Sequence, residues 1–89
     1  MPKITFQTST EFKKWLTDLS SIRKYSLYLT TQPPRIIAIP LVSTDPINYG
    51  IFESDDIKDL ESLAKELSTL LSLPLYKAVT LEFADFKSR

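Results

Sequence analysis

The sequence predicts a single α+β domain over residues 1–89, in which two helices pack on one face of an antiparallel sheet of three to five strands. Two segments, residues 9–22 and 55–73, repeat apolar residues at the three-and-four spacing of an amphipathic helix. Between them lie three segments with the composition of strands, joined by short turns. Short connections favour an antiparallel meander, and both helices can cover the same face of it.

The first helix is predicted to begin at a capping box. Residues 3–7, KITFQ, alternate enough for a short strand, and residues 8–11, TSTE, follow directly. In a capping box Thr8 accepts from the backbone N–H of Glu11, and the Glu11 side chain reaches back toward Thr8. The apolar face of this helix consists of Phe12, Trp15, Leu16, Leu19 and Ile22. We expect Trp15 to belong to the core.

Three strands are predicted after this helix. Residues 24–30 alternate with period two, which is typical of a half-buried strand, and residues 35–42, RIIAIPLV, are apolar on both faces. Pro33 and Pro34 favour a hairpin loop between them, and Pro40 indicates an edge or a bulge. Residues 47–53, INYGIFE, form the third strand, in which Gly50 indicates a bulge or the close approach of a neighbour.

The segment 55–73 carries the clearest helical pattern in the chain. Its apolar stripe consists of Ile57, Leu60, Ala64, Leu67 and Leu71, and Leu63 and Leu70 widen it. Ser54, Asp55 or Asp56 can cap the first turn, and Pro74 ends the helix. Residues 75–83 alternate cleanly, which predicts a last strand. If the third strand is only a loop, the same order becomes the split-βαβ plait.

The composition excludes most classes of catalytic site. The 89 residues contain no cysteine, no histidine and one glycine. This excludes disulfide frameworks, thiolate nucleophiles, ordinary zinc sites, imidazole acid–base catalysis and glycine-rich phosphate loops. We therefore expect a protein that is not an enzyme and that takes no cofactor and no small-molecule substrate. No apolar run approaches the ~20 residues of a membrane span, so we expect a cytoplasmic protein without membrane contacts.

An acidic cluster surrounds the start of the second helix. It consists of Glu53, Asp55, Asp56, Asp59 and Glu61. Such carboxylates could bind Mg²⁺ or Ca²⁺, but they lack EF-hand spacing, and acidic residues favour the positive end of a helix dipole without any ligand. We therefore predict no metal here.

The basic residues are concentrated in the first half of the chain. Residues 1–44 carry six basic and two acidic residues, hence +4, and the second half balances them. Cations neutralise phosphates and aromatic rings stack on bases, so a surface of this kind can face RNA, although an ordinary solvated surface has a similar composition. The candidate RNA-binding residues are Lys13, Lys14, Arg23, Lys24 and Arg35. The sheet that is apolar on both faces indicates a protein partner as well.

Two stretches resemble the smaller of the two Alu-domain proteins of the signal recognition particle. They are residues 6–12, FQTSTEF, and residues 52–55, FESD, continuing into Asp59-Leu60 and residues 63–65. The resemblance implies a heterodimer with a paralogous subunit, whose joined sheet forms a concave RNA-binding surface. Lys24 and Arg35 fall on matching strand positions, and Lys13 and Lys14 would contribute from the first helix. The family is more basic than this chain and does not require the last strand.

A second resemblance rests on residues 36–42 and residues 73–76, LPLY. These stretches are similar to small proteasome-assembly chaperones, which also pair as heterodimers but end in a further helix. We therefore expect a non-catalytic module that pairs with a paralogous subunit and contributes to RNA binding in a ribonucleoprotein particle. The alternative is a protein-only assembly chaperone or adaptor, for example in proteasome assembly.

Overall fold

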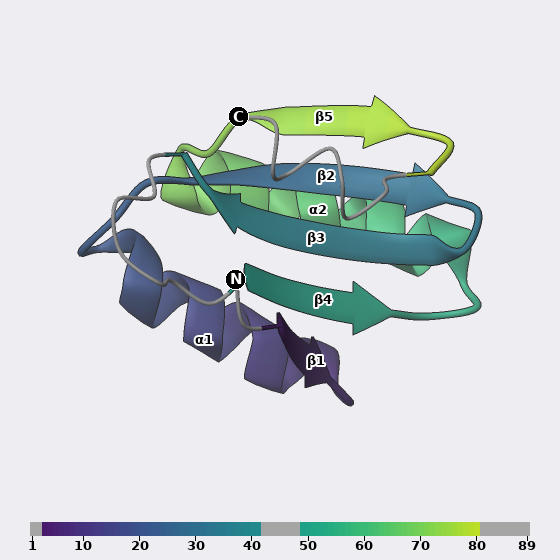
Figure 1. Ribbon diagram of the computed structural model, residues 1–89, viewed down its shortest axis with the longest axis horizontal. Coiled ribbons are helices and arrows are strands. Elements are labelled where there is room, and N and C mark those ends of the chain that lie inside the picture. Colours follow the sequence, from purple (N-terminus) through teal and green to yellow (C-terminus); the bar gives the residue numbers. More distant parts are fainter. Residues whose placement is uncertain (1–2, 42–48, 81–89) are drawn as a thin grey trace.

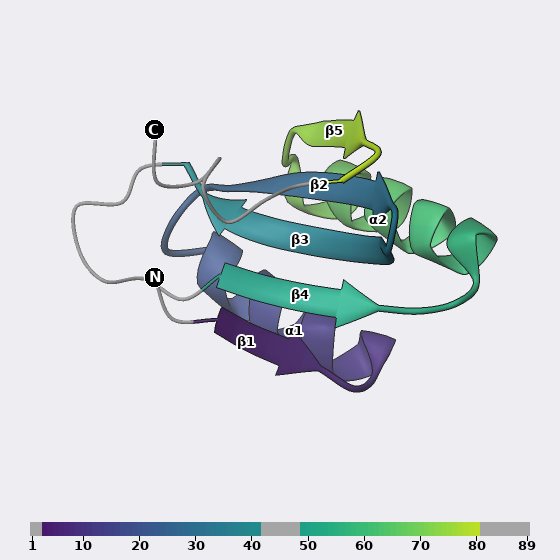
Figure 2. The ribbon, with the colours of Figure 1, turned by 45° about the vertical axis from the view of Figure 1, so that its right-hand side comes forward.

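The computed structural model describes residues 3–41 and 49–80. Seven elements follow one another along the chain (Figure 1). They are β1 (Lys3–Phe6), α1 (Ser9–Ser20), β2 (Tyr25–Thr31), β3 (Pro34–Pro40), β4 (Tyr49–Glu53), α2 (Ile57–Leu71) and β5 (Leu75–Ala78). The strands form one sheet in the order β1-β4-β3-β2-β5, and both helices lie on the same face of it (Figure 2). The predicted α+β class with two helices on one face is confirmed.

The sheet is mixed, so the prediction of a purely antiparallel sheet was wrong at its two outer strands. β3 runs antiparallel to both β2 and β4, as expected for a meander. β1 is parallel to β4 and β5 is parallel to β2. The reason is the two helical crossovers, β1–α1–β2 and β4–α2–β5, because a helix returns the chain to the end of the sheet from which it started. Since β4 is a strand, the split-βαβ plait is also excluded.

The predicted N-cap starts α1. The Thr8 hydroxyl accepts from the Glu11 N–H at 3.2 Å, and it also donates to the Glu11 carboxylate at 3.1 Å. The helix ends at Ser20, and the hydroxyls of Ser20 and Ser21 donate to backbone carbonyls of its last turn. Ile22 therefore lies beyond the helix and is 73% exposed, so its predicted place on the buried stripe was wrong.

α2 is capped at Asp56, whose carboxylate accepts from the N–H groups of Lys58 and Asp59 at 3.1 and 3.2 Å. The helix is shorter than predicted at both ends. It ends at Leu71, and the next residue, Ser72, adopts a left-handed conformation with φ of 55°, two residues before Pro74. Leu60, Ala64 and Leu67 are buried as predicted, whereas Ile57 at the first helical position is exposed.

The sheet is apolar on both faces, as the continuous apolar run of residues 35–42 predicted. Ile36 and Ala38 belong to the core beneath the helices, together with residues of β2, α1 and α2. Ile37 and Ile39 point to the opposite face, where a second buried cluster forms. This second cluster consists of Tyr28, Ile37, Ile39, Tyr49 and Ile51. Within residues 3–41 and 49–80, no helix covers that face.

The ends of three strands differ from the predictions. Pro40 is the last residue of β3, which is the central strand, so the expectation of an edge or a bulge was wrong. β5 ends at Ala78, because the next carbonyl, that of Val79, accepts from the N–H groups of Thr31 and Gln32 at the β2–β3 hairpin. The remaining predicted strand residues, 42, 47–48 and 81–83, lie outside the described residues.

Gly50 is required by the close approach of Trp15, the second of the two reasons predicted for it. The registers of β4 with β1 and β3 run through Gly50 without a bulge. A Cβ atom at this position would lie 2.5 and 2.7 Å from Trp15 Cζ3 and Cη2. The Trp15 ring is in turn held by Phe6 and Tyr25, at centroid distances of 5.2 and 5.7 Å. The absent side chain therefore lets α1 pack closely on β4.

We expect Gly50→Ala to lower the free energy of unfolding by about 1–3 kcal/mol, because the added methyl group overpacks against the Trp15 ring. Urea denaturation followed by circular dichroism measures this loss. In a Trp15→Leu background the cost of the same substitution should fall by at least about 0.5 kcal/mol, since the clash is removed. Equal costs in the two backgrounds would show that Trp15 is not the cause.

The Asp56 cap provides a second prediction for the fold. Asp56→Ala should destabilise the protein by about 1 kcal/mol, because two N–H groups of α2 lose their acceptor. Asp55→Ala removes the same charge one residue earlier and should cost less than about 0.5 kcal/mol. Asp56→Asn keeps an acceptor oxygen and should restore most of the loss. Thermal denaturation of the three variants checks this order, and similar losses for Asp55→Ala and Asp56→Ala would contradict the capping role.

Candidate functional site

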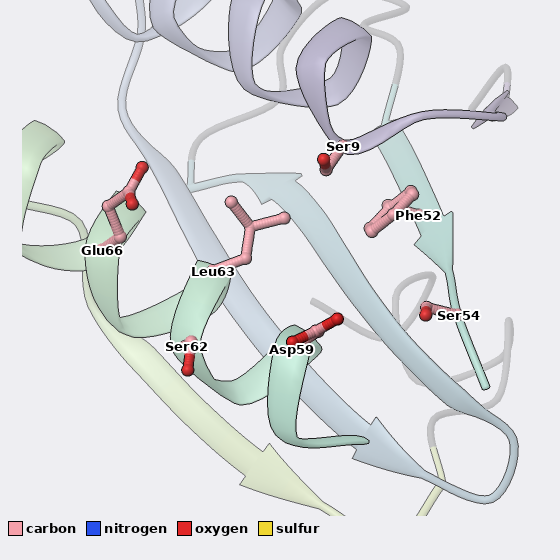
Figure 3. A pocket seen from close by; sticks show the side chains of 7 residues that line it. All are labelled: Ser9, Phe52, Ser54, Asp59, Ser62, Leu63 and Glu66. Carbon is pink, nitrogen blue, oxygen red and sulfur yellow. The ribbon is translucent and has the colours of Figure 1, made fainter. Parts of the chain in front are cut away.

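A groove lies between α1 and α2 on the helical face of the molecule (Figure 3). It has a volume of about 280 Å³ and is open to solvent. Its lining residues are Ser9, Phe52, Ser54, Asp59, Ser62, Leu63 and Glu66. An adjoining hollow of about 350 Å³ shares Ser9, Leu63 and Glu66 and adds Thr10 and Lys13. We call the two hollows together the α1–α2 groove.

Three parts of the chain build the α1–α2 groove. The first turn of α1 supplies Ser9, and the end of β4 supplies Phe52 on the face that the helices cover. The segment that runs from Ser54 through the first three turns of α2 supplies the remaining wall. In Figure 3 the Leu63 side chain extends from α2 into the space below α1, on the side toward Ser9 and Phe52. The groove exists because α1 packs on β1 and β4 whereas α2 packs on β2 and β3, so the helices lie over different parts of the sheet.

The groove combines an apolar floor with an acidic rim. Phe52 and Leu63 are half-buried and pack against the core, where Phe52 stacks on Phe12 at a centroid distance of 6.0 Å. Asp59 and Glu66 are exposed at the edge. The Lys13 ammonium of α1 donates to the Glu66 carboxylate and so bridges the two helices. Since both side chains are about half exposed, this ion pair contributes only about 0–1 kcal/mol and can exchange partners.

The described polar groups of the groove include three serine hydroxyls and two carboxylates. Of these, the Ser54 hydroxyl accepts from the Asp56 N–H at 3.2 Å and belongs to the capping turn of α2. Among the described residues, no group of three or more histidine, cysteine, aspartate or glutamate side chains is placed to hold a metal ion. What the groove can hold is an apolar side chain on its floor and a cation at its rim.

The apolar floor continues along α2 through Leu70. Leu63 and Leu70 are seven residues apart, which is close to two helical turns, so both lie on the same side of α2. Leu70 is 60% exposed, whereas Leu67 on the sheet-facing side is fully buried. The sequence predicted that these two leucines widen the apolar stripe. It did not predict that Leu70 would stay exposed, because the pattern alone does not tell which residues of the stripe the sheet covers.

The five candidate RNA-binding residues do not form one patch. Lys13 lies in the α1–α2 groove, and Lys14 is exposed on α1. Arg23 and Lys24 lie between α1 and β2, at the start of β2. Arg35 pairs in register with Thr30, near the other end of β2, so it is roughly 20 Å from Lys24 along the strand direction. Adjacency in the chain brings Arg23 close to Lys24 and Lys13 close to Lys14, but the structure does not join these two pairs and Arg35 into one patch.

Arg35 is also engaged by an acidic neighbour. Its Nε lies 3.1 Å from a carboxylate oxygen of Glu53, the residue opposite it on β4. The N–H of Nε makes no hydrogen bond, so the contact is a Coulombic pair without hydrogen-bond geometry. Their chain neighbours Ile36 and Phe52 belong to the core beneath the helices. Because successive side chains of a strand point to opposite faces, Arg35 and Glu53 lie on the face away from the helices. Lys13 and Arg35 are therefore both paired with carboxylates.

The other side of α2 carries a separate charged cluster next to β5. A Glu61 carboxylate oxygen lies 3.2 Å from the Lys65 ammonium and 3.8 Å from the Lys77 ammonium. The hydrogen bond from Lys65 and the charges of Lys77 and Lys65 lower the pKa of Glu61 below its ordinary value of 4.5. This cluster fastens β5 to α2 on the face that the helices cover.

Comparisons with known proteins identify no family for this chain. No family model matches the sequence, and no curated protein and no solved structure matches it significantly. The resemblances to the signal recognition particle protein and to proteasome-assembly chaperones therefore stay predictions. Among the described residues, no helix is both long and apolar enough to cross a membrane.

The Glu61 cluster makes a prediction for pH dependence. A lowered carboxyl pKa in the folded state means that the cluster stabilises the fold above about pH 4.5, and that this contribution is lost as the pH falls through the folded pKa. Lys77→Met should move the pKa of Glu61 back toward its ordinary value, whereas Lys14→Met, on α1, should leave it unchanged. Carboxyl NMR titration measures both. An unchanged Glu61 pKa in Lys77→Met would contradict the assignment of Lys77 as a cause.

Proposed function

We propose that this chain is a non-catalytic protein-binding module that holds a segment of a partner protein in the α1–α2 groove. The observation that carries the proposal is the apolar line of Leu63 and Leu70, which continues out of the groove and ends in a leucine that is 60% exposed. Exposed apolar surface next to a hollow with polar edges is typical of an interaction site. This corresponds to the predicted alternative of a protein-only assembly chaperone or adaptor.

The chemistry of the groove defines the partner segment. Leu63 and Leu70 are separated by seven residues, about 10 Å along the axis of α2. A partner helix that presents apolar side chains at positions i and i+7 along α2 matches this spacing. Asp59 and Glu66 favour a lysine or arginine beside those apolar residues, because an arriving cation can replace Lys13 at Glu66. The partner is therefore a basic amphipathic segment, whether or not it belongs to a paralogous subunit.

RNA binding is less well supported by the same geometry. The groove rim is acidic and repels phosphate groups, and Lys13 and Arg35 are already paired with carboxylates. The remaining predicted cations are spread along α1 and the start of β2. The aromatic residue next to Lys14 is Trp15, which is half-buried and packs against Phe6, Phe12 and Tyr25, so its ring is engaged in the core. We therefore favour peptide binding in the groove over RNA binding, and an RNA-binding assay can tell the two functions apart.

A random library of 15-residue peptides displayed on phage tests the proposal. We expect the enriched peptides to carry apolar residues seven apart with lysine or arginine beside them. Leu70→Lys should weaken their binding at least about tenfold, because about 1.5 kcal/mol of apolar contact is lost. Ile22→Lys is the matched control: it places the same charge at a residue of similar exposure away from the groove, and binding should stay within about twofold.

Two results would overturn the proposal. One is equal binding of the enriched peptides to the Leu70→Lys and Ile22→Lys variants, or no enrichment above background. The other is salt-sensitive binding of the purified chain to hairpin RNA, with an affinity that falls as Arg23 and Lys24 are replaced by alanine and does not respond to Leu70→Lys. The second result would support the RNA-binding interpretation instead.

A further inference from the structure

β5 forms one edge of the sheet and presents apolar side chains there. Among the described residues, no strand pairs with its outer side. Tyr76 is 49% exposed and Val79, directly after the strand, is 60% exposed. The four residues of β5 contain no proline and no bulge, which are two of the devices that usually protect a sheet edge.

The hydrogen-bond pattern shows which peptide groups face outward. The Leu27 N–H donates to the Pro74 carbonyl at 2.9 Å, and β5 then runs parallel to β2 in register. Because peptide groups of alternate residues point to opposite edges of a strand, those of Tyr76 and Ala78 face β2. The N–H and C=O groups of Leu75 and Lys77 therefore point away from the sheet and are available to another strand.

The side chains of β5 restrict how a second strand can pair with it. Tyr76 lies on the sheet face opposite the helices, stacked on Tyr28 at a centroid distance of 5.2 Å. Leu75 and Lys77 lie on the helical face, where the Lys77 ammonium is 3.8 Å from Glu61. The strand carries one positive charge and no negative charge. Any pairing that sets Lys77 opposite another lysine is therefore unfavourable.

We propose that two copies of this chain pair antiparallel through β5, with the two Tyr76 residues opposite each other on the two-fold axis. In this register Leu75 of each copy lies opposite Lys77 of the other, so the outward peptide groups of both residues are satisfied. The Lys77 stem packs over the facing leucine, and the two Tyr28–Tyr76 stacks join into one row of four rings. The register shifted by one residue on each strand would instead oppose Lys77 to Lys77.

This inference goes beyond the proposed function, because it uses β5 and the face opposite the helices and leaves the α1–α2 groove free. A second copy fits this edge better than an unrelated peptide, since the edge is complementary to itself: an apolar and a cationic residue flank an aromatic residue at the centre. An isologous interface of this kind closes after two copies and joins two five-stranded sheets into one.

Cysteine cross-linking tests the register, because the chain contains no cysteine of its own. Residues opposite each other in a non-hydrogen-bonded antiparallel pair have Cα atoms about 4.5 Å apart, which a disulfide can span. We expect Tyr76→Cys to form a covalent dimer under mild oxidation. Lys77→Cys, oxidised under the same conditions, should form no covalent dimer, because its two Cα atoms would be roughly 8 Å apart, beyond the reach of a disulfide. Efficient cross-linking of Lys77→Cys, or none of Tyr76→Cys, would overturn the register.

Sedimentation equilibrium tests the dimer itself without a cross-link. The unaltered chain should show a concentration-dependent dimer, and Lys77→Pro should abolish it, because proline removes only an outward N–H and leaves the pairing with β2 intact. Lys77→Ala is the matched control that also loses the contact with Glu61, and it should still dimerise. A monomer at all concentrations, or equal dimerisation of Lys77→Pro and Lys77→Ala, would overturn the proposal. Peptide binding by the monomeric Lys77→Pro variant then tests the groove separately.

Discussion

Burial of β3 on both faces is the constraint on which the remaining structure depends. Ile36 and Ala38 pack beneath the helices, and Ile37 and Ile39 belong to the cluster on the opposite face. A strand of this kind is stable only in the interior of a sheet, with a neighbour on each side. β2 and β4 fill those places as antiparallel partners through short connections, and the two helical crossovers then have to put β1 and β5 outside them. The mixed sheet follows from this order.

The placement of the two helices follows from the same constraint and produces the α1–α2 groove. α1 packs closely on β4 because Gly50 has no side chain that would clash with the Trp15 ring, whereas α2 lies over β2 and β3. The helices are therefore bridged at their edges, by Lys13 and Glu66, above a floor of Phe52 and Leu63. The groove forms because the two crossovers place α1 and α2 over different strands of the sheet. Leu63 and Leu70 of α2 face this gap, so neither the sheet nor α1 covers them completely.

Charge is distributed around α2 according to what each side of the helix meets. Toward β5, Glu61 is surrounded by Lys65 and Lys77, which lower its pKa and hold the edge strand to the helix. Toward α1, Glu66 is paired with Lys13 and Asp59 lies at the groove edge as a second carboxylate, so this wall of α2 carries two negative charges. The groove therefore reflects the uneven charge of the chain. The acidic second half supplies Asp59 and Glu66 on one wall, and the basic first half supplies Lys13 on the other.

The sequence by itself determined the features that depend on neighbours within a few residues. These include the Thr8 cap of α1, an acidic cap for α2, the buried faces of both helices, the apolar character of both faces of β3 and the small residue required at Gly50. Of the candidate site it singled out separate parts: Ser54 and Asp59 at the start of α2, the widened stripe of Leu63 and Leu70, and Lys13 as a candidate for RNA binding. Sheet order, the parallel outer strands, the exposure of Ile22 and the pairing of Lys13 and Arg35 with carboxylates were decided by the tertiary structure. The physical reason is that strand pairing and helix placement join residues tens of positions apart, and their energies depend on a core that no single segment encodes.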